Sequence, residues 1–215
     1  IGIALGVSGA QAVGVPVGGV EDRLLRPLHA GQLRQHVVAH QLREAVAVND
    51  APTLIRFPKG EAIESVPAVR RQDGMDILLE GSNELLIISV GAMAKLAVDS
   101  AKLIGATVVD PRWVKPVNPA LVAMAQNFKN VLVIEDGLKH GGIASSVREL
   151  LSDSSVDIPV HSIGVPLEFI EHSKRQEILA DLGITVQNIA RSLVEANSGT
   201  IELAKPLQRD ENVDR

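Results

Sequence analysis

Arg56 is the residue whose position most clearly suggests chemistry in this 215-residue chain. It lies near the end of a short β-rich apolar segment, 52–57, and is followed by Pro58, Lys59 and Gly60. A guanidinium at the rim of a sheet can donate two parallel hydrogen bonds to a phosphate, and Lys59 offers a second positive charge. The pattern indicates a phosphate ligand. The alternative is a salt bridge from Arg56 to acidic residues in the segment that follows.

A second candidate is the loop that contains Gly141 and Gly142. It follows a predicted strand that ends in Glu135 and Asp136, and it opens a predicted helix over 142–151. Backbone N–H groups at a helix N-terminus can hold an anion, and doubly wound folds bind ligands beyond the carboxyl ends of their strands. The alternative is a tight strand-to-helix turn in which the glycines let the helix pack closely. Both interpretations stay open at this point.

Two other groups of polar residues are better explained by structure. His36 and His40 stand four positions apart on a predicted helix, but no third ligand is evident nearby, so we predict no metal site. The segment 110–116 contains two prolines and the only Trp of the chain. We interpret it as a rigid corner at which Arg112 and Lys115 face a neighbouring domain.

The elements that must position these residues follow from the hydrophobic pattern. Strands are predicted at 85–90, 107–110, 131–135 and 160–163, and helices at 92–104, 119–127, 142–151, 174–182 and 186–196. The strands are continuous apolar runs, which a sheet covered on both faces requires. This alternation predicts an α/β fold with a doubly wound, mostly parallel sheet.

The rest of the chain divides into four parts. Residues 1–30 form an atypical Gly-rich segment, whose uncharged first 20 residues contain six glycines and a proline and so argue against a membrane helix. Residues 31–60 predict a helix and a strand that end another α/β domain. Residues 61–84 predict an inter-domain linker with one small hairpin, 85–196 the complete domain, and 197–215 a polar tail.

The composition narrows the class of function. The chain has no cysteine, 2% aromatic residues and a formal net charge of −5. The absence of Cys excludes disulfide scaffolds, Cys-ligated metals and thiol nucleophiles, and it is typical of a cytoplasmic protein. Few aromatics and a negative charge argue against nucleic-acid and membrane partners. A small molecule or another protein is the expected partner.

Four motifs, in this order and at this spacing, carry a resemblance to a known family. They are NDAPTLIRFPKG (49–60), VDPRWVKP (109–116), VIED with GG (133–136 and 141–142), and IGVPLEFI through DLGI (163–170 and 181–184). The chain resembles the end of the 1-deoxy-D-xylulose-5-phosphate synthase family, thiamine-diphosphate enzymes of the transketolase superfamily. The resemblance covers about 33–194. It implies that 31–60 end a pyrimidine-binding domain and that 85–196 are a transketolase C-terminal domain.

The resemblance implies a homodimeric enzyme that condenses pyruvate with glyceraldehyde 3-phosphate, with loss of CO2, for isoprenoid biosynthesis. Arg56 matches the arginine that holds the acceptor's phosphate. The family's ligands for thiamine diphosphate and Mg²⁺ and its catalytic residues lie upstream of the matched region, so we expect no catalytic residue or metal ligand here and no activity in isolation. The alternatives are a non-catalytic interaction or regulatory module of transketolase C-terminal type and a relative of the dehydrogenase β-subunits.

Overall fold

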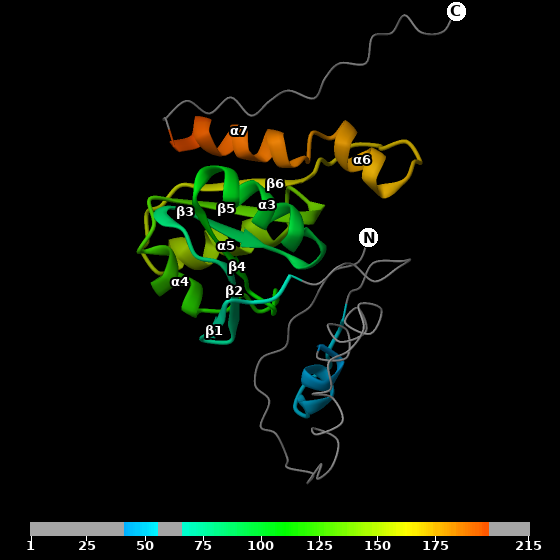
Figure 1. The fold of residues 1–215 in the computed structure, drawn as a ribbon. Coiled ribbons are helices and arrows are strands. Elements are labelled where there is room, and N and C mark those ends of the chain that lie inside the picture. The colour runs from blue at the N-terminus through cyan, green and yellow to red at the C-terminus, as the bar shows by residue number, and fades with distance from the viewer. Residues whose placement is uncertain (1–40, 56–65, 198–215) are drawn as a thin grey trace, which may run out of the picture.

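The computed structural model describes residues 41–55 and 66–197, and they contain one six-stranded sheet. Its strands lie side by side in the order β1–β2–β4–β3–β5–β6 (Figure 1). The strands are β1 (Arg70–Gln72), β2 (Met75–Leu79), β3 (Ser82–Ser89), β4 (Ala106–Asp110), β5 (Asn130–Leu138) and β6 (Val160–Val165). Strands β3 to β6 run parallel, while the hairpin β1–β2 is antiparallel and joins β4 through β2. The predicted mostly parallel sheet is confirmed.

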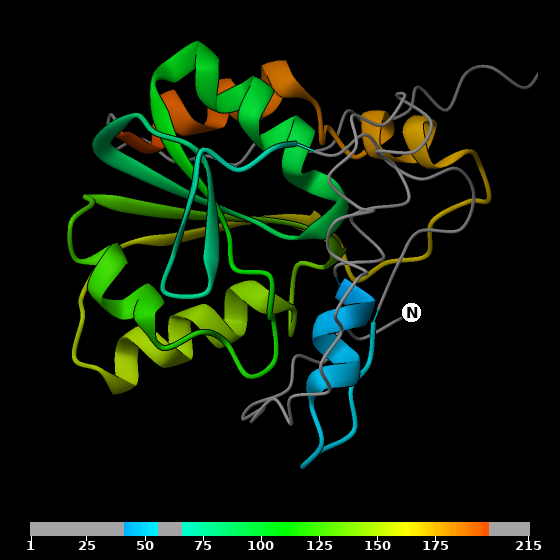
Figure 2. The same ribbon diagram turned by 60° about the horizontal axis from the view of Figure 1, so that its bottom comes forward.

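Helices cover both faces of this sheet. They are α3 (Ala94–Ile104), α4 (Ala120–Ala125), α5 (Ile143–Asp153), α6 (Arg175–Asp181) and α7 (Val186–Asn197), with a 3-10 turn η1 (Gly91–Met93) before α3. Figure 2 shows α3 and α7 on one side of the sheet and α4 and α5 on the other. The predicted doubly wound α/β fold is therefore confirmed, with each predicted strand and helix from residue 85 onward found within a few residues of its expected bounds.

The core consists of two apolar layers, one on each face of the sheet. Leu85 and Ile87 of β3 face the layer under α3 and α7, whereas Leu86 and Ile88 face the layer under α4 and α5. Alternate residues of a strand point to opposite faces, so both layers draw on the same continuous apolar run. Each fully buried Leu or Ile contributes about 1.5–3 kcal/mol. Aliphatic side chains therefore build this core almost without aromatic ones.

Single residues near the helix termini fix where the helices begin and end. Gly105 ends α3 in a left-handed conformation (φ 69°), and the Asn118 side chain accepts a hydrogen bond from the Ala120 N–H (2.9 Å). The spacing of Ser173 and Gln176 indicates a capping box between these two residues, but α6 does not form it. Glu177 accepts hydrogen bonds from the Lys174 N–H and from the Ser173 hydroxyl instead, because its carboxylate lies three residues after the N-cap.

The hairpin expected within the linker 61–84 belongs to the sheet. Strand β2 pairs with β4, with Asp76 opposite Asp110 and Ile77 opposite Val109, and it buries Met75 and Ile77. The folded unit therefore extends to Arg70 instead of beginning at residue 85. The physical reason is that a short apolar run lowers its free energy by covering the exposed side of β4, a partner that lies far along the chain.

The segment before the sheet is described over 41–55 only. Residues 41–47 form a helix, and the Thr53 hydroxyl donates to the Ala45 carbonyl (3.2 Å). Residues 52–55 are not paired into a strand within the described ranges, so the strand expected over 52–57 is not found in that part. The Gly-rich segment 1–30, the pair His36 and His40, and the tail from 198 lie outside the described residues. Among the helices that are described, none is long and apolar enough to cross a bilayer.

Candidate functional site

The carboxyl edge of the sheet is the place where this topology can form a ligand site. The chain leaves β3 toward α3 on one face and leaves β5 toward α5 on the other, so the switch point lies between these neighbouring strands. Ser89 and Ile134 are register partners at this edge, which places Glu135 and Asp136 directly beyond it. The acidic pair and the glycine loop predicted from the sequence thus lie at the switch point.

Glu135 occupies the N-terminus of α5. One carboxylate oxygen accepts a hydrogen bond from the Ile143 N–H (3.1 Å) and the other from the Ala144 N–H (3.2 Å). The side chain is buried (4% exposed), and the positive end of the helix dipole stabilises its charge. The N–H groups that could have held an external anion therefore already hold a carboxylate of the chain itself.

Gly142 and Gly141 make this arrangement possible in different ways. Gly142 is the N-cap of α5, and a Cβ atom there would overlap both carboxylate oxygens of Glu135 and the Leu138 carbonyl oxygen. Gly141 adopts a left-handed conformation (φ 75°), with open space where a Cβ atom would lie. Gly142 is needed because the Glu135 carboxylate approaches its Cα closely, and Gly141 because its backbone is left-handed. The geometry thus favours the strand-to-helix turn over the anion loop.

Asp136 ties the same edge to the start of α6. Its carboxylate pairs with the Arg175 guanidinium, with 3.2 Å between Oδ2 and Nη2. Strand β6 is joined to this loop as well, since the Lys139 N–H donates to the Val165 carbonyl (2.8 Å). The end of β5 and the loop after it therefore anchor the C-terminal elements of the fold, and the acidic pair is used in internal contacts.

Arg112 forms the second charged cluster of this edge, beyond the end of β4. Its Nη1 donates to Asp76 Oδ2 (2.7 Å) in β2, and its Nη2 donates to Glu44 Oε1 (2.5 Å) in the helix over 41–47. Arg71 adds a contact to the other oxygen of Asp76 (2.8 Å). Arg112 thus faces the described segment that precedes the sheet, whereas no hydrogen bond or ion pair of Lys115 with that segment is found among the described residues. The Arg112 guanidinium bonds to Glu44 and Asp76 at once and so joins this segment to strand β2.

Sequence reasoning missed the acidic partners of Arg112. The Arg112 backbone has a left-handed conformation (φ 59°), and its N–H donates to Asp110 Oδ1 (2.7 Å). A local signal existed for Asp76, because it is a lone acid within the otherwise apolar strand β2. Glu44 carried no such signal, because it lies among ordinary polar residues of a helix.

Burial and charge shift the acidity of this cluster. Burial raises the pKa of Asp110 to about 6, although the N–H and the charge of Arg112 act in the opposite direction. Burial alone would also raise the pKa of Asp76, but hydrogen bonds and charges from Arg71 and Arg112 outweigh it and lower that pKa. Asp110 is thus a carboxyl group that titrates near neutrality next to one that stays ionised.

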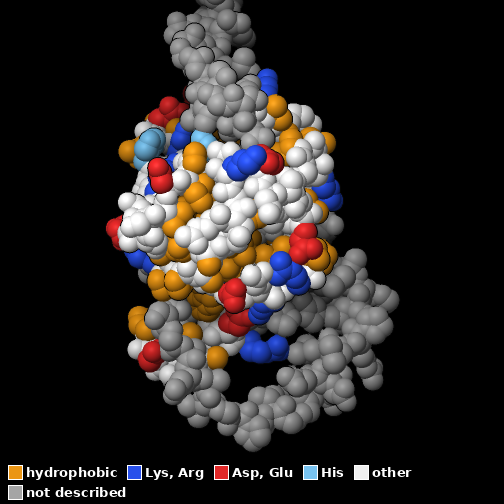
Figure 3. All heavy atoms as spheres, turned by 90° about the vertical axis from the view of Figure 1, so that its left-hand side faces the viewer, with side chains coloured by type: hydrophobic (Ala, Val, Ile, Leu, Met, Phe, Trp, Pro, Cys, Tyr) orange, Lys and Arg blue, Asp and Glu red, His pale blue; other side chains and the backbone are white. Residues whose placement is uncertain are grey.

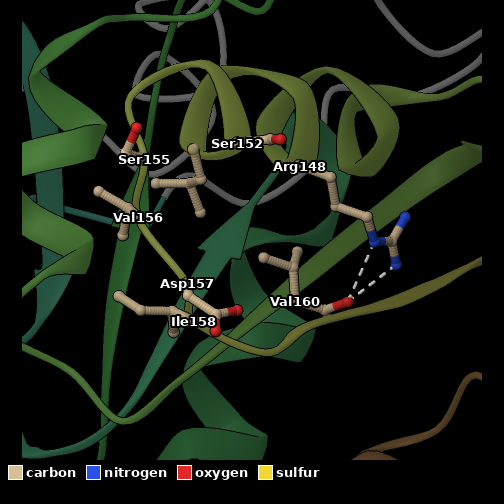
Figure 4. Close-up of a pocket in the computed structure, with 8 residues that line it drawn as sticks. Arg148, Ser152, Ser155, Val156, Asp157, Ile158 and Val160 are labelled. Atoms are coloured by element: carbon tan, nitrogen blue, oxygen red, sulfur yellow. Dashed lines mark hydrogen bonds between the residues drawn. The ribbon is translucent and has the colours of Figure 1, made fainter.

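One surface pocket of the described chain lies at the opposite, amino edge of the sheet, and a second lies along its β1–β2 side. The first, of about 390 Å³, lies between the end of α5 and the start of β6, where Arg148 donates twice to the Val160 carbonyl (Figure 4). The other, of about 560 Å³, lies between the β1–β2 hairpin and the end of α4. Figure 3 looks onto the amino edge of the sheet, where acidic and basic side chains are interspersed with apolar ones. Neither pocket is lined by Glu135 or Arg112.

His161 lies at the same amino edge, in β6. Its Nε2 atom is buried and has no hydrogen-bond partner, and burial, with the nearby charge of Arg148, lowers its pKa. Within 41–55 and 66–197, no three His, Asp or Glu side chains are arranged to hold a metal ion. Arg56 and Lys59, the predicted phosphate ligands, lie outside the described residues.

Comparison with known families identifies the class of this fold. The family model "Transketolase, C-terminal domain" matches residues 75–189, which is more than half of the chain. This chain belongs to the transketolase C-terminal domain family. The match begins at β2 and so includes a strand of the hairpin that the structure adds to the sheet.

Particular relatives refine this assignment. The chain is 45% identical over 190 residues to 1-deoxy-D-xylulose-5-phosphate synthase 1 of Streptomyces coelicolor, a match covering 86% of this chain and 28% of that protein. It is 43% identical over 196 residues to the synthase of Pseudarthrobacter chlorophenolicus, covering 86% and 29%. The chain resembles a C-terminal portion of these synthases and spans under a third of their length. The resemblance inferred from the four motifs is confirmed.

One solved structure supports the fold. It is described as a split gene transketolase, inactive beta4 tetramer, and it matches with a TM-score of 0.64 and 27% identity. The match covers 74% of this chain and 54% of that one. Transketolase-type C-terminal architecture is therefore shown by sequence and by three-dimensional similarity.

Proposed function

We propose that this chain is the C-terminal part of a 1-deoxy-D-xylulose-5-phosphate synthase, a cytoplasmic homodimer that condenses pyruvate with glyceraldehyde 3-phosphate for isoprenoid biosynthesis. The observation that carries the proposal is the 45% identity over 190 residues to the Streptomyces coelicolor synthase 1. Identity at this level extends across the whole sheet and both helical layers. It therefore supports a role inside that enzyme and goes beyond a shared fold.

The described residues do not fit the cofactor of that reaction. The N-terminus of α5 holds the Glu135 carboxylate where a diphosphate would need free N–H groups. The acids of the carboxyl edge are likewise engaged, Asp136 with Arg175 and Asp76 with Arg71 and Arg112. We propose that thiamine diphosphate and Mg²⁺ bind outside the described residues and that this domain acts as a support for the segment that precedes it.

Calorimetry tests whether this chain binds the cofactor by itself. The purified 215-residue chain should give no binding heat when titrated with thiamine diphosphate and Mg²⁺, whereas the intact Streptomyces coelicolor synthase 1 should bind both. The chain should also form no product from pyruvate and glyceraldehyde 3-phosphate. Micromolar cofactor affinity in the chain alone would contradict the proposal.

We further propose that Arg56 binds the phosphate of glyceraldehyde 3-phosphate, because its motif NDAPTLIRFPKG matches the position of the family's phosphate ligand. The test uses a fusion in which the upstream part of the Streptomyces coelicolor synthase 1 precedes residue 33 of this chain. Arg56→Ala should raise the KM for glyceraldehyde 3-phosphate at least tenfold and leave that for pyruvate unchanged. The control Arg191→Ala removes an arginine from an exposed site of α7. Equal KM values of the two variants for glyceraldehyde 3-phosphate would instead support the salt-bridge alternative for Arg56.

A second candidate function is a separate subunit that requires a partner chain. The split gene transketolase favours it, because there a protein of this architecture exists as a β subunit that is described as inactive in its β4 form. The two candidates differ in one observation. A subunit should restore synthase activity when mixed with a separately produced upstream part, whereas a portion of one polypeptide should require the covalent fusion. No observation on the described residues favours the dehydrogenase β-subunit alternative.

A further inference from the structure

The loop that joins β6 to α6 exposes two large apolar side chains. Leu167 is 75% exposed and Phe169 is exposed completely, and they stand two positions apart. Phe169 is also one of only three phenylalanines in the chain. The helix that follows, α6, has no buried residue. Neighbouring large apolar side chains that none of the described residues covers mark a contact surface.

This loop is held at both ends by contacts already described. At its start, Val165 is tied to Lys139, and a side chain at Gly164 would press on the Gly137 carbonyl (3.1 Å), so β6 ends close against the loop after β5. At its end, Arg175 pairs with Asp136. The two apolar side chains are therefore presented from a fixed base, as a docking site requires.

The loop lies at the carboxyl edge of the sheet, as does the Arg112–Glu44 contact. Loop 166–174 follows the end of β6, whereas Arg112 follows the end of β4, with β3 and β5 between them. Three strand spacings of about 4.8 Å separate the two positions by roughly 15 Å. In Figures 1 and 2 the helix over 41–47 and α6 both lie beyond the end of the sheet at which β5 ends.

We propose that the carboxyl edge of this sheet is the docking face for the upstream part of the synthase, with Leu167 and Phe169 as its apolar anchor. The proposal rests on the proposed function. The matched relatives carry roughly 70% of their length outside the region that this chain covers, so a large body must pack somewhere on it. The anchor lies at the β6 end of the face, and the Arg112–Glu44 contact lies at its β4 end.

The helix over 41–47 indicates where that body begins. It is the last described element before the sheet, and its side chains Leu42 (53% exposed) and Val46 (75% exposed) face no core in the described residues. A domain of about 150 residues has a radius of gyration of about 15 Å. A body that packs on Leu42 and Val46 is therefore wide enough to reach Phe169 at the other end of the same edge.

A second copy of this chain is a poorer occupant for the anchor. Glu168 and Glu171 flank Phe169. A two-fold contact through the loop would bring these carboxylates of both copies together, and like charges that meet in an interface oppose association. A different surface with basic residues at its rim would instead complement them. The charge pattern thus favours the upstream part over self-association.

Thiol labelling tests the face directly, because the chain has no cysteine of its own. Glu168→Cys places a reporter between the two anchor residues without changing either of them. Lys102→Cys is the matched control on α3, beside the exposed Leu103 at the amino edge. Both variants are prepared in the 215-residue chain and in the fusion with the upstream part of the Streptomyces coelicolor synthase 1. The rate of reaction with dithiobis-nitrobenzoate is then measured.

Docking predicts that Glu168→Cys reacts at least tenfold more slowly in the fusion than in the chain alone, while Lys102→Cys reacts equally fast in both. Adding Leu167→Ser and Phe169→Ser to the fusion should restore fast labelling. Equal rates for Glu168→Cys in both proteins overturn the proposal. Slowing that depends on the concentration of the isolated chain also overturns it, in favour of a second copy.

Synthase activity of the same fusion separates this inference from the proposed function. An active fusion in which Glu168→Cys stays fully reactive leaves the function in place and overturns the docking face. A protected thiol in an inactive fusion supports the face and counts against the function.

Discussion

Arg112 and Glu44 stand 68 positions apart in the chain and meet as an ion pair, with 2.5 Å between Nη2 and Oε1. The other arm of the same guanidinium holds Asp76 at 2.7 Å. One side chain thus connects the segment before the sheet, strand β2 and the turn after β4. Because the Arg112 side chain is only 16% exposed, solvent screens these contacts far less than it screens a surface pair.

Arg112→Met should lower the free energy of unfolding by about 3 kcal/mol, because it leaves the largely buried Asp76 without one of its two cations. Urea denaturation measures this change. Glu44→Gln is the milder control, since Glu44 is about one-third exposed and its loss should cost about 1 kcal/mol or less. Both variants should speed hydrogen exchange in the helix over 41–47. Unchanged exchange in both would show that Arg112 does not hold this helix.

Asp110→Asn should stabilise the fold above pH 6. The pKa of Asp110 is raised from 3.8 in the unfolded chain to about 6 in the fold, so its contribution is fully present below pH 3.8 and is lost as pH rises to about 6. This shift corresponds to roughly 3 kcal/mol. Asparagine keeps an oxygen that can accept from the Arg112 N–H and carries no charge to bury. The gain should be largest near pH 7.5 and should vanish near pH 3.5.

The pH dependence of Asp76 provides the control for this experiment. Its pKa is lowered in the fold, so the stability it contributes is present above pH 3.8 and is lost only as pH falls through the folded value. Asp76→Asn should therefore destabilise the protein at pH 7.5, where Asp110→Asn stabilises it. A difference between Asp110→Asn and the parent that stays constant from pH 3.5 to 7.5 would contradict the assignment of the raised pKa.

Gly142→Ala and Gly141→Ala should differ in their effect on stability. A methyl group at residue 142 would overlap the Glu135 carboxylate and force it off the α5 N-terminus, at a cost of about 3 kcal/mol. At residue 141 the methyl group meets open space, so only the left-handed backbone is penalised, by about 1 kcal/mol. Thermal and urea denaturation measure both changes. Equal, small losses would favour the anion loop, in which neither glycine supports a buried contact.

Arg148→Ala should promote association of the chain through strand β6. Strand β6 is an edge of the sheet, and Arg148 donates to the Val160 carbonyl (2.9 and 3.1 Å) and to the Ser162 hydroxyl (3.1 Å). The Val160 carbonyl points away from β5, because the Pro159 carbonyl before it bonds to β5. Without the guanidinium, this group is free to pair with another strand. Sedimentation velocity should show self-association of Arg148→Ala that Arg191→Ala does not show.

The elements between residues 85 and 196 could be predicted because their signals are local. The run Leu85–Leu86–Ile87–Ile88 is apolar at every position, which indicates a strand covered on both faces wherever it lies in the sheet. Gly105 and Asn118 act through backbone atoms within two to four residues of themselves. The sequence by itself therefore determined the fold class, the order of elements and, through four motifs, the family.

Only the tertiary structure decided how the candidate site is used. In the sequence, Glu135 and Gly142 leave both an anion loop and a tight turn open, and the structure shows that the Glu135 side chain accepts the N–H groups of α5. The place of β2 beside β4, and the meeting of Arg112 with Glu44, depend on pairing between segments far apart in the chain. The physical reason is that strand pairs and ion pairs form between whichever distant segments bury the most surface and satisfy the most polar groups together. Local residue patterns do not determine which segments these are.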